Sequence, residues 1–397
     1  MKRIVAGIMA VCVMGGVMPN IAGVTENSVI TASAVDEYIE GTYEQLTYKN
    51  YGDHIGISGC DESATIVVIP DKIADLPVTS IEKYAFEFCE NLISVNIPNT
   101  VTSIEERAFE DCKNLISVNI PNTVTKIGDW SFNGCSGLTS IEIPDSVKTI
   151  GGMAFWNCNN LKSLKISNSI TRIERDTFYG CSSLTSIEIP NSVTSIGAWA
   201  FEHCSSLMSI EIPESVISIE ERTFCNCSSL TSITIPDSVT SIGRGAFEIC
   251  SNLKSITILN PDCDIYDNES TISNKYNSVG RFDSFNGTIY GYKNSTAQAY
   301  AEKYNYKFAS LGKAPEKELS AGDINGDDKI DSTDASLILA EYSLLSTSTG
   351  EFTEAMKKSA DINKDGLTDS ADASLILVYY GYTSTGGTDN IEKFIGL

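Results

Sequence analysis

Two acidic stretches near the carboxyl end of the chain carry the residue types best suited to chemistry. Aspartate and asparagine recur at positions 1, 3, 5, 9 and 12 of a stretch that begins at Asp323 and of another that begins at Asp361. Calcium is held by six or more oxygens, and a loop folded around it turns alternate residues inward. The spacing therefore predicts two calcium ions, with the backbone carbonyl of position 7 as a further ligand. The predicted ligands are Asp323, Asn325, Asp327, Lys329, Asp331 and Asp334 in the first loop, and Asp361, Asn363, Asp365, Leu367, Asp369 and Asp372 in the second.

Each acidic stretch runs directly into an apolar helical segment, and no helical segment precedes either one. The ligand spacing is that of an EF-hand loop, except that position 12 is aspartate instead of glutamate. With these departures, residues 320–384 resemble the type I dockerin, the calcium-dependent module that anchors proteins to cellulosome scaffolds. The resemblance implies a scaffold cohesin as partner, and the near symmetry of the halves suggests that either one can face it. The implied contact positions hold Ser332, Thr333, Leu339, Ala340, Ser370, Ala371, Leu377 and Val378.

The two loops differ at the turn in their middle. Asp328 stands in the first loop where Gly366 stands in the second. This turn favours a positive φ, which glycine adopts freely and aspartate less readily. We therefore expect the first site to bind calcium more weakly or to fill more slowly. Because acidic residues crowd this segment, we also expect calcium to order it.

The middle of the chain is a repeat array with an unbroken period of 23 residues. Phenylalanines stand at 86, 109, 132, 155, 178, 201, 224 and 247, and cysteines at 89, 112, 135, 158, 181, 204, 227 and 250. A fixed period of this length predicts a solenoid whose regularly spaced apolar residues point into every coil. The alternating Leu-x-Ser-Ile-x-Ile stretch of each unit predicts a short strand, so the stacked coils should form one continuous parallel sheet.

This unit resembles the BspA-like, or treponemal-type, leucine-rich repeat, and the segments on either side of the array resemble its end caps. The predicted fold is a leucine-rich-repeat solenoid with a parallel β-sheet face, plus a small α-helical calcium-binding dockerin domain with duplicated EF-hand-like loops. We expect a signal peptide at 1–34, an N-terminal β cap at 35–78, repeats at 79–260, a C-terminal cap at 261–312, a linker at 313–319, the dockerin at 320–385 and a tail at 386–397.

The first residues of the chain are typical of a secreted protein. A basic start at Met1-Lys2-Arg3, an apolar run from Ile4 to Met18 and the small residues Ala32-Ser33-Ala34 predict a signal peptide. No segment approaches the ~20 apolar residues that a membrane span requires. The net charge of −24 excludes nucleic acid as a partner, since no basic surface exists to meet phosphates. We expect an extracellular protein attached to a cellulosome.

The cysteines require a separate argument, because a secreted chain with 12 of them usually contains disulfides. Eight of them occupy one inward position per coil, where the distances permit bridges but stacked parallel side chains have unfavourable dihedral angles. A free cysteine packs well as a small apolar residue. We therefore expect a reduced, buried ladder. Cys225 and Cys227 form only a Cys-x-Cys pair, and the histidines His54 and His203 are far apart in sequence, so no zinc site is expected.

Two surfaces of the array are candidates for a ligand. Glu188 and Glu211 fall on adjacent coils, and two close carboxylates are the machinery of a retaining glycosidase. Lys165 neighbours Glu188, and an open sheet offers no enclosure to separate two carboxyl pKa values, so a solvated charge pattern is the simpler interpretation. Trp156 and Tyr179 take equivalent positions in successive coils, where aromatic rings either stack on sugars or cover the core.

These observations predict a secreted, non-catalytic cellulosome subunit. Its dockerin would bind a cohesin with calcium and display the repeat module for protein interaction or adhesion, within a polysaccharide-degrading system. The alternative is a carbohydrate-binding module that targets the complex to plant cell-wall polysaccharide, and a glycoside hydrolase is the third hypothesis.

Overall fold

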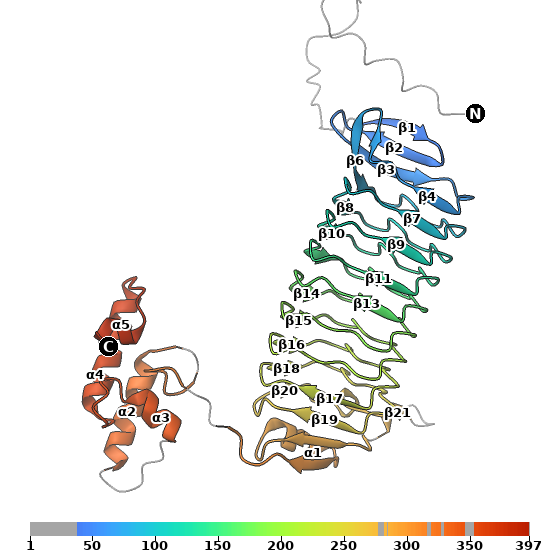
Figure 1. Cartoon of the computed structure of the whole chain (residues 1–397). Helices are drawn as coiled ribbons and strands as arrows, with labels where there is room; N and C mark the ends of the chain where they lie inside the picture. The colour runs from blue at the N-terminus through green and yellow to red at the C-terminus, as the bar shows by residue number, and fades with distance from the viewer. Residues whose placement is uncertain are drawn as a thin grey trace, which may run out of the picture.

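The computed structural model describes residues 38–276, 282–283, 285–315, 319–326, 329–345 and 353–396. An elongated stack of coils is followed by a small helical domain (Figure 1). Each part has its own cluster of buried apolar residues, so each has a separate hydrophobic core. The expected signal peptide at 1–34 and the loop residues Asp327 and Asp328 lie outside the described residues.

An antiparallel sheet begins the solenoid. The strands β1 (Ile39–Tyr43), β2 (Leu46–Asn50) and β3 (Ile55–Cys60) pair in antiparallel order, and β3 then pairs in parallel with β6 (Leu76–Ile81). The short β5 (Lys72–Ile73) pairs with β6 in the antiparallel direction. This sheet covers the apolar end of the stack, which would otherwise be open to water.

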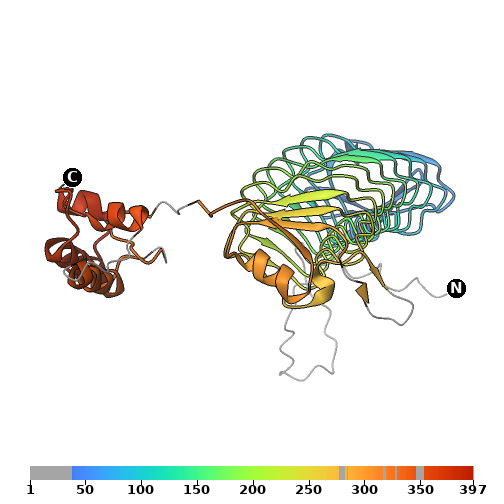
Figure 2. The same ribbon diagram turned by 90° about the horizontal axis from the view of Figure 1, so that it is seen from below.

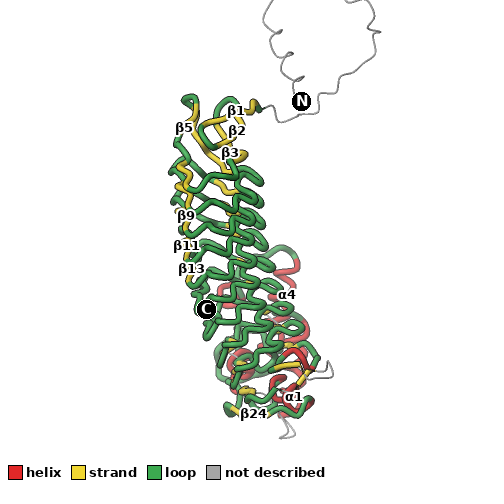
Figure 3. Tube along the Cα trace, turned by 90° about the vertical axis from the view of Figure 1, so that its right-hand side faces the viewer, coloured by secondary structure: helices red, strands yellow, loops and turns green. Residues whose placement is uncertain are grey.

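The strands of the coils lie on two faces of the stack, and all their neighbours are parallel. Figure 3 shows them as short segments separated by turns and loops. The first face begins with β4 (Ile66–Val68), which lies in the segment expected as the N-terminal cap. The strands predicted from the Leu-x-Ser-Ile-x-Ile stretch follow it, namely β7 (Ser94–Asn96), β9 (Ser117–Asn119), β11 (Ser140–Glu142), β13 (Ser163–Lys165), β17 (Ser232–Ile235) and β19 (Ser255–Ile258). The second face has β8 (Ser103–Ile104), β10 (Lys126–Ile127), β12 (Thr149–Ile150), β14 (Arg172–Ile173), β15 (Ser195–Ile196), β16 (Ser218–Ile219), β18 (Ser241–Ile242) and β20 (Asp264–Ile265).

The predicted sheet is therefore parallel, but it is not continuous. Strand pairing is interrupted between β9 and β11 and between β13 and β17 on the first face, and between β12 and β14 on the second. Glu188 and Glu211 occupy consecutive coils within the break between β13 and β17. Like charges directly opposite each other destabilise a strand pair. Where β11 pairs with β13, in contrast, Lys165 Nζ lies 2.7 Å from Glu142 Oε1. Charge does not account for every break, however, because Asn119 and Glu142 flank the break between β9 and β11.

The core of the solenoid is a column of stacked phenylalanine rings. The rings from Phe86 to Phe247 are almost completely buried, and neighbouring ring centroids are 4.9 to 5.7 Å apart. Beside this column, the thiol of each ladder cysteine from Cys112 to Cys250 donates to a phenylalanine carbonyl at 3.0 to 3.2 Å. The two ladders therefore fix one coil on the next through both packing and hydrogen bonds.

A mixed segment ends the array. Figure 2 shows helix α1 (Thr296–Lys303) lying across the last coils. Ser295 caps this helix by accepting from Gln298 N, and the buried Ala297, Tyr300 and Ala301 pack it onto the stack. The remaining elements are the 3-10 turn η1 (Glu269–Thr271), and the strands β21 (Lys275–Tyr276), β22 (Phe282–Asp283), β23 (Thr288–Gly291) and β24 (Lys307–Ser310).

The C-terminal domain is built on two related helices, α2 (Ser332–Leu345) and α4 (Ser370–Ser384), with the shorter α3 (Glu354–Ala360) between them. Helix α3 ends directly before Asp361, so the expectation that no helix precedes the second loop is wrong. Ile338 of α2 and Ile376 of α4 are both fully buried in its core. The stretch 386–397, expected as a tail, contains α5 (Ile391–Ile395), whose Ile391 is only 3% exposed and joins the same core. In the part of the chain that the structure describes, no helix is long and apolar enough to cross a membrane.

Candidate functional site

The second acidic loop has a folded turn organised by its first aspartate. The Asp361 carboxylate accepts from Asp365 N at 3.0 Å and from Gly366 N at 2.9 Å. Lys364 and Gly366 both have positive φ, 58° and 85°. Leu367 N donates to Asp365 Oδ1 at 2.8 Å. The backbone of the loop is thus bent by the same side chains that the sequence predicts as calcium ligands.

The aspartate at position 12 is completely buried in both loops. Asp372 accepts from the backbone N–H groups of Ile362, Asn363 and Asp369 at 2.9, 3.2 and 2.9 Å. Asp334 accepts in the same pattern at 2.8, 3.2 and 2.9 Å. Burial raises the pKa of the Asp372 carboxyl, although the three backbone donors act in the opposite direction. A cation beside such a buried carboxylate would stabilise its charged form.

The residues of these loops fit calcium by their chemistry. Each loop presents carboxylate, carboxamide and carbonyl oxygens in the order that a calcium loop requires. Among the described residues, however, no three acidic, histidine or cysteine side chains converge on one point as metal ligands would. The carboxylates of the second loop instead hydrogen-bond to the loop backbone. The first loop is described without Asp327, its predicted ligand at position 5.

The helix faces divide into a core side and an exposed side that the sequence alone does not separate. Leu377 and Val378 of α4 are 45% and 59% exposed, and Leu339 of α2 is 44% exposed. Tyr380, three residues after Leu377 on the same helix, is also 45% exposed, and sequence reasoning missed it because tyrosine serves equally well in a core. The remaining predicted contact residues are all exposed, namely Ser332, Thr333, Ala340, Ser370 and Ala371.

The aromatic residues of the middle coils form a row along the stack. The rings of Trp156 and Tyr179 have centroids 5.6 Å apart, and Trp130 meets Trp156 at 6.0 Å. His203, to which the sequence assigns no role, extends the row at 5.2 Å from Tyr179. Trp199 lies elsewhere, with the Arg175 guanidinium 3.8 Å from its ring centroid. The regular spacing of tryptophan and tyrosine in the repeat indicates this row, but only the backbone path places His203 within it.

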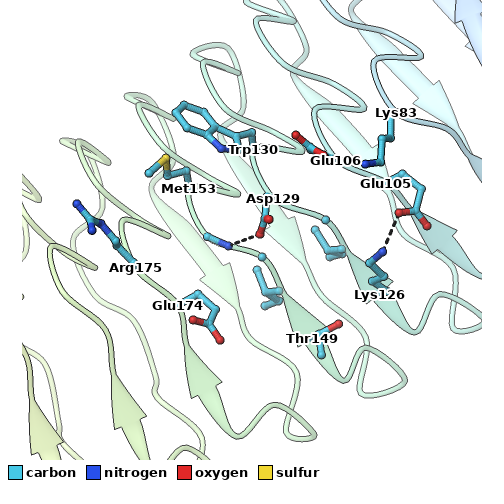
Figure 4. Close-up of a pocket in the computed structure, with 15 residues that line it drawn as sticks. Lys83, Glu105, Glu106, Lys126, Asp129, Trp130, Thr149, Met153, Glu174 and Arg175 are labelled. Carbon is cyan, nitrogen blue, oxygen red and sulfur yellow. Dashed lines mark hydrogen bonds and ion pairs between the residues drawn. The ribbon is translucent and has the colours of Figure 1, made fainter.

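A hollow on the surface of the array lies beside three glycines of neighbouring coils (Figure 4). Its volume is about 570 Å³, and Gly128, Gly151 and Gly152 form its floor. The charged side chains around it are already paired, Lys126 with Glu105 at 2.8 Å and Lys83 with Glu106 at 3.0 Å. Gly152 N donates to Asp129 Oδ1 at 2.8 Å. These internal pairs leave little polar capacity for a ligand.

The paired glutamates on the strand face lie at a hollow of about 620 Å³. Glu188 and Glu211 are both exposed, and Lys165 pairs with Glu142, so it does not neutralise Glu188 as a simple alternating charge pattern would require. Two exposed carboxyls lack the contrasting surroundings that give one an acid role and the other a nucleophile role. This geometry does not favour hydrolysis.

The stacked coils and the paired calcium-type loops define a leucine-rich-repeat protein with a C-terminal docking domain. Residues 63–185 and 171–274 match the BspA type leucine rich repeat region, in six copies, and residues 321–379 match the dockerin type I domain. The repeat match extends over more than half of the chain, so the protein belongs to the BspA type leucine-rich-repeat family. Neither kind of domain is catalytic, and both are typical of extracellular or cell-surface proteins.

Solved structures of bacterial leucine-rich-repeat proteins are similar to the chain. One, from Bacteroides ovatus, is 28% identical with a TM-score of 0.48, over 65% of this chain and 70% of that one. Another, from T. pallidum, is 27% identical with a TM-score of 0.38, over 54% of this chain and 91% of that one. A leucine rich cell surface protein of Faecalibacterium prausnitzii is 21% identical with a TM-score of 0.39, over 71% of this chain and 96% of that one. No curated protein matches the sequence.

Proposed function

We propose that this protein is a secreted, non-catalytic cellulosome subunit whose dockerin binds a scaffold cohesin in a calcium-dependent way. The observation that carries the proposal is the duplicated loop and helix with an exposed contact face on each copy. Leu339 on α2 and Leu377 on α4 occupy equivalent positions, and both are nearly half exposed while the isoleucine before each is fully buried. Either helix therefore offers the same apolar centre to a partner.

Calcium would be held by the six predicted ligands of each loop, as given for Asp323 to Asp334 and for Asp361 to Asp372. When bound, it would neutralise the carboxylates and fix the loop geometry. The chain's own part is to keep Asp334 and Asp372 buried at the start of the two helices, where backbone N–H groups orient them. Ordered loops then fix the small residues at positions 10 and 11 on the partner face.

Cohesin capture by the full-length protein tests this proposal. We expect binding in calcium and loss of binding in chelator. Because the halves are equivalent, Leu339→Asp with Ala340→Asp should weaken binding only slightly, as should Leu377→Asp with Val378→Asp. The four substitutions together should weaken it by 100-fold or more, roughly the loss of a buried apolar hot spot. Met208→Asp, at an exposed position of the array, is the matched control.

Two results would contradict the proposal. Binding in chelator that equals binding in calcium would remove calcium from the mechanism. Retention of cohesin by the fourfold variant would move the partner face away from α2 and α4. Normal folding of each variant is checked by its circular dichroism spectrum.

For the repeat array we propose display of a surface for protein interaction or adhesion, within a polysaccharide-degrading system. The open solenoid supports this, because stacked coils give an extended face for a partner. A second function, carbohydrate binding, is favoured by one specific observation: Trp156 and Tyr179 are in contact and only partly buried. We retain the other domain boundaries given above, with the signal peptide at 1–34, as part of the proposal. The dockerin is extended to include α5, because Ile391 joins its core.

A further inference from the structure

Three members of the aromatic row, Trp156, Tyr179 and His203, line one side of an open hollow of about 440 Å³ in the middle of the array. This volume lies within the range of about 300–1,000 Å³ that is typical of small-ligand sites. The other lining groups are carboxamides, hydroxyls and an imidazole, and no lysine, arginine, aspartate or glutamate lines it. The aromatic–amide pocket is defined by Trp156, Asn157, Asn159, Tyr179, His203 and Asn226.

The pocket arises where the repeat departs from its own pattern. The residue after each ladder phenylalanine is a glutamate in half of the coils, among them Glu110, Glu202 and Glu248, and those three are buried. Trp156 and Tyr179 replace it in two consecutive coils. Because every coil follows the same backbone path, coil formation does not require aromatic residues there. A substitution confined to neighbouring coils points instead to a local role.

Glycine at 180 makes room for one of the amides that line the pocket. The residue two after each phenylalanine has a positive φ, which is 71° at Gly180. A Cβ at this position would lie 2.2 Å from Asn157 Oδ1, so the missing side chain leaves room for the Asn157 carboxamide. The amide thus lies over the glycine, beside the aromatic wall.

Several polar groups of the pocket have unused hydrogen-bonding capacity. Within the described part of the chain, no hydrogen bond is made by the side-chain carboxamides of Asn157 and Asn159, by the Trp156 indole N–H or by the Tyr179 hydroxyl. Asn226 Nδ2 lies 2.7 Å from His203 Nδ1. If this amide donates, Nδ1 accepts and the ring proton sits on Nε2. Burial lowers the pKa of His203, which keeps the imidazole neutral near pH 7.

We propose that the aromatic–amide pocket binds a neutral oligosaccharide. A sugar ring has an apolar face of C–H groups and a rim of hydroxyls that both donate and accept. Aromatic rings match the face, and carboxamides, which also donate and accept, match the rim. The uncharged lining and the net charge of −24 disfavour acidic sugars. This inference rests on the second function proposed for the array and does not depend on cohesin binding.

The row also sets the direction of the ligand. Trp130, Trp156, Tyr179 and His203 come from successive coils, so the row follows the axis of the stack. A linear oligosaccharide would lie along this axis and contact several coils at once. Longer oligomers should then bind more tightly than short ones.

Calorimetric titration of the full-length protein tests the inference. The probes are hexasaccharides of β-linked glucose, xylose and mannose, with a galacturonic acid oligomer as the acidic comparison. We expect at least one neutral hexasaccharide to bind at least 10-fold more tightly than the acidic oligomer and than its own disaccharide. Trp156→Ala and Asn157→Ala should each weaken that binding by 10-fold or more. Trp199→Ala and Asn160→Ala, a tryptophan and an asparagine outside the pocket, are the matched controls and should leave it unchanged.

The opposite outcomes overturn the inference. They are no binding of any neutral oligosaccharide, preference for the acidic oligomer, or affinity that Trp156→Ala and Asn157→Ala leave intact. Asn157→Ala is informative even if Trp156→Ala misfolds, because Asn157 is a surface side chain with no internal hydrogen bond. Cohesin capture is measured on the same samples. Capture without sugar binding would refute the pocket alone, and loss of capture would refute the dockerin proposal instead.

Discussion

Glu202 is a carboxylic acid that the coil buries, with only 7% of its surface exposed. Burial raises the pKa of this carboxyl above its ordinary value near 4.5. The folded protein therefore binds the proton more tightly than the unfolded chain does, and this contribution to stability is lost as the pH rises through the folded pKa. We expect Glu202→Gln, which cannot ionise, to be more stable than the wild type at about pH 7 and equal to it near pH 4.

Thermal melts at both pH values check this expectation. A gain of a few degrees at neutral pH that disappears in acid is the expected result. Glu62→Gln, at an exposed position where burial adds nothing, is the matched control and should change neither melt. A Glu202→Gln variant that melts below the wild type at both pH values would show that the carboxylate is stabilising where it lies.

At the same scale of single residues, sequence spacing locates the loop positions but not the direction of their side chains. The twelve-residue pattern indicates Asp334 and Asp372 directly, yet their hydrogen bonds to three backbone N–H groups each depend on the fold of the loop. His203 shows the same limit. One histidine in a repeat gives no periodic signal, and only the stacking of coils brings it against Tyr179.

The phenylalanine ladder is the element that couples one coil to the next. Phe155 is fully buried, and its ring centroid lies 5.4 and 5.7 Å from those of Phe132 and Phe178. Phe155→Ala leaves a cavity between two rings, and we expect it to lower the free energy of unfolding of the array by about 3–5 kcal/mol. Phe88→Ala, at a position 52% exposed, is the control and should change it by less than about 1 kcal/mol. Denaturant melts followed by circular dichroism measure both; equal effects would contradict a close-packed ladder.

The thiols of the cysteine ladder should react slowly while the array is folded. Burial raises the pKa of Cys181 to about 12, so its reactive thiolate is scarce at neutral pH. Cys60 is half-buried, and its hydrogen bond with Cys89 raises the pKa of the Cys60 thiol and lowers that of Cys89. We therefore expect a thiol-alkylating reagent to label this pair well before the ladder cysteines from Cys112 to Cys250. Denaturant without reductant should expose the ladder and allow complete labelling. Mass spectrometry that finds ladder cysteines still unlabelled in denaturant would indicate disulfides.

The repeat pattern predicts elements well where they recur and poorly where they are short. The period of 23 predicts the solenoid and its inward residues, because a fixed spacing leaves few other folds. The second set of strands, such as Lys126–Ile127, spans two residues each and gives no alternating signal. The repeat also predicts one continuous sheet, because every unit has a similar alternating stretch, and it does not locate the breaks in strand pairing after β9 and after β13.

At the scale of the whole molecule, two separate cores predict two separate unfolding transitions. The array core is continuous from Leu46 to Tyr306, whereas the dockerin core runs from Ile324 to Ile391. The array core contains a long phenylalanine ladder, whereas the dockerin core is a small cluster of isoleucines and alanines with Tyr379, so we expect the array to melt at the higher temperature. Calcium would bind only the folded dockerin and would therefore raise the melting temperature of the lower transition only. At a calcium concentration 100 times the dissociation constant, each site would add about 2.7 kcal/mol to the free energy of unfolding of the dockerin.

Scanning calorimetry in calcium and in chelator measures both transitions on the full chain. Chelator should lower the dockerin transition or abolish it, because the buried Asp334 and Asp372 would then lack a cation. Asp361→Ala should lower the temperature of the dockerin transition in the presence of calcium, but by less than chelator does. The substitution removes one predicted ligand and the two backbone hydrogen bonds that shape its loop. The array transition should stay fixed in every case, because its core holds no residue of the loops. If chelator shifted both transitions together, the two cores would unfold as one unit, and calcium would stabilise the solenoid as well.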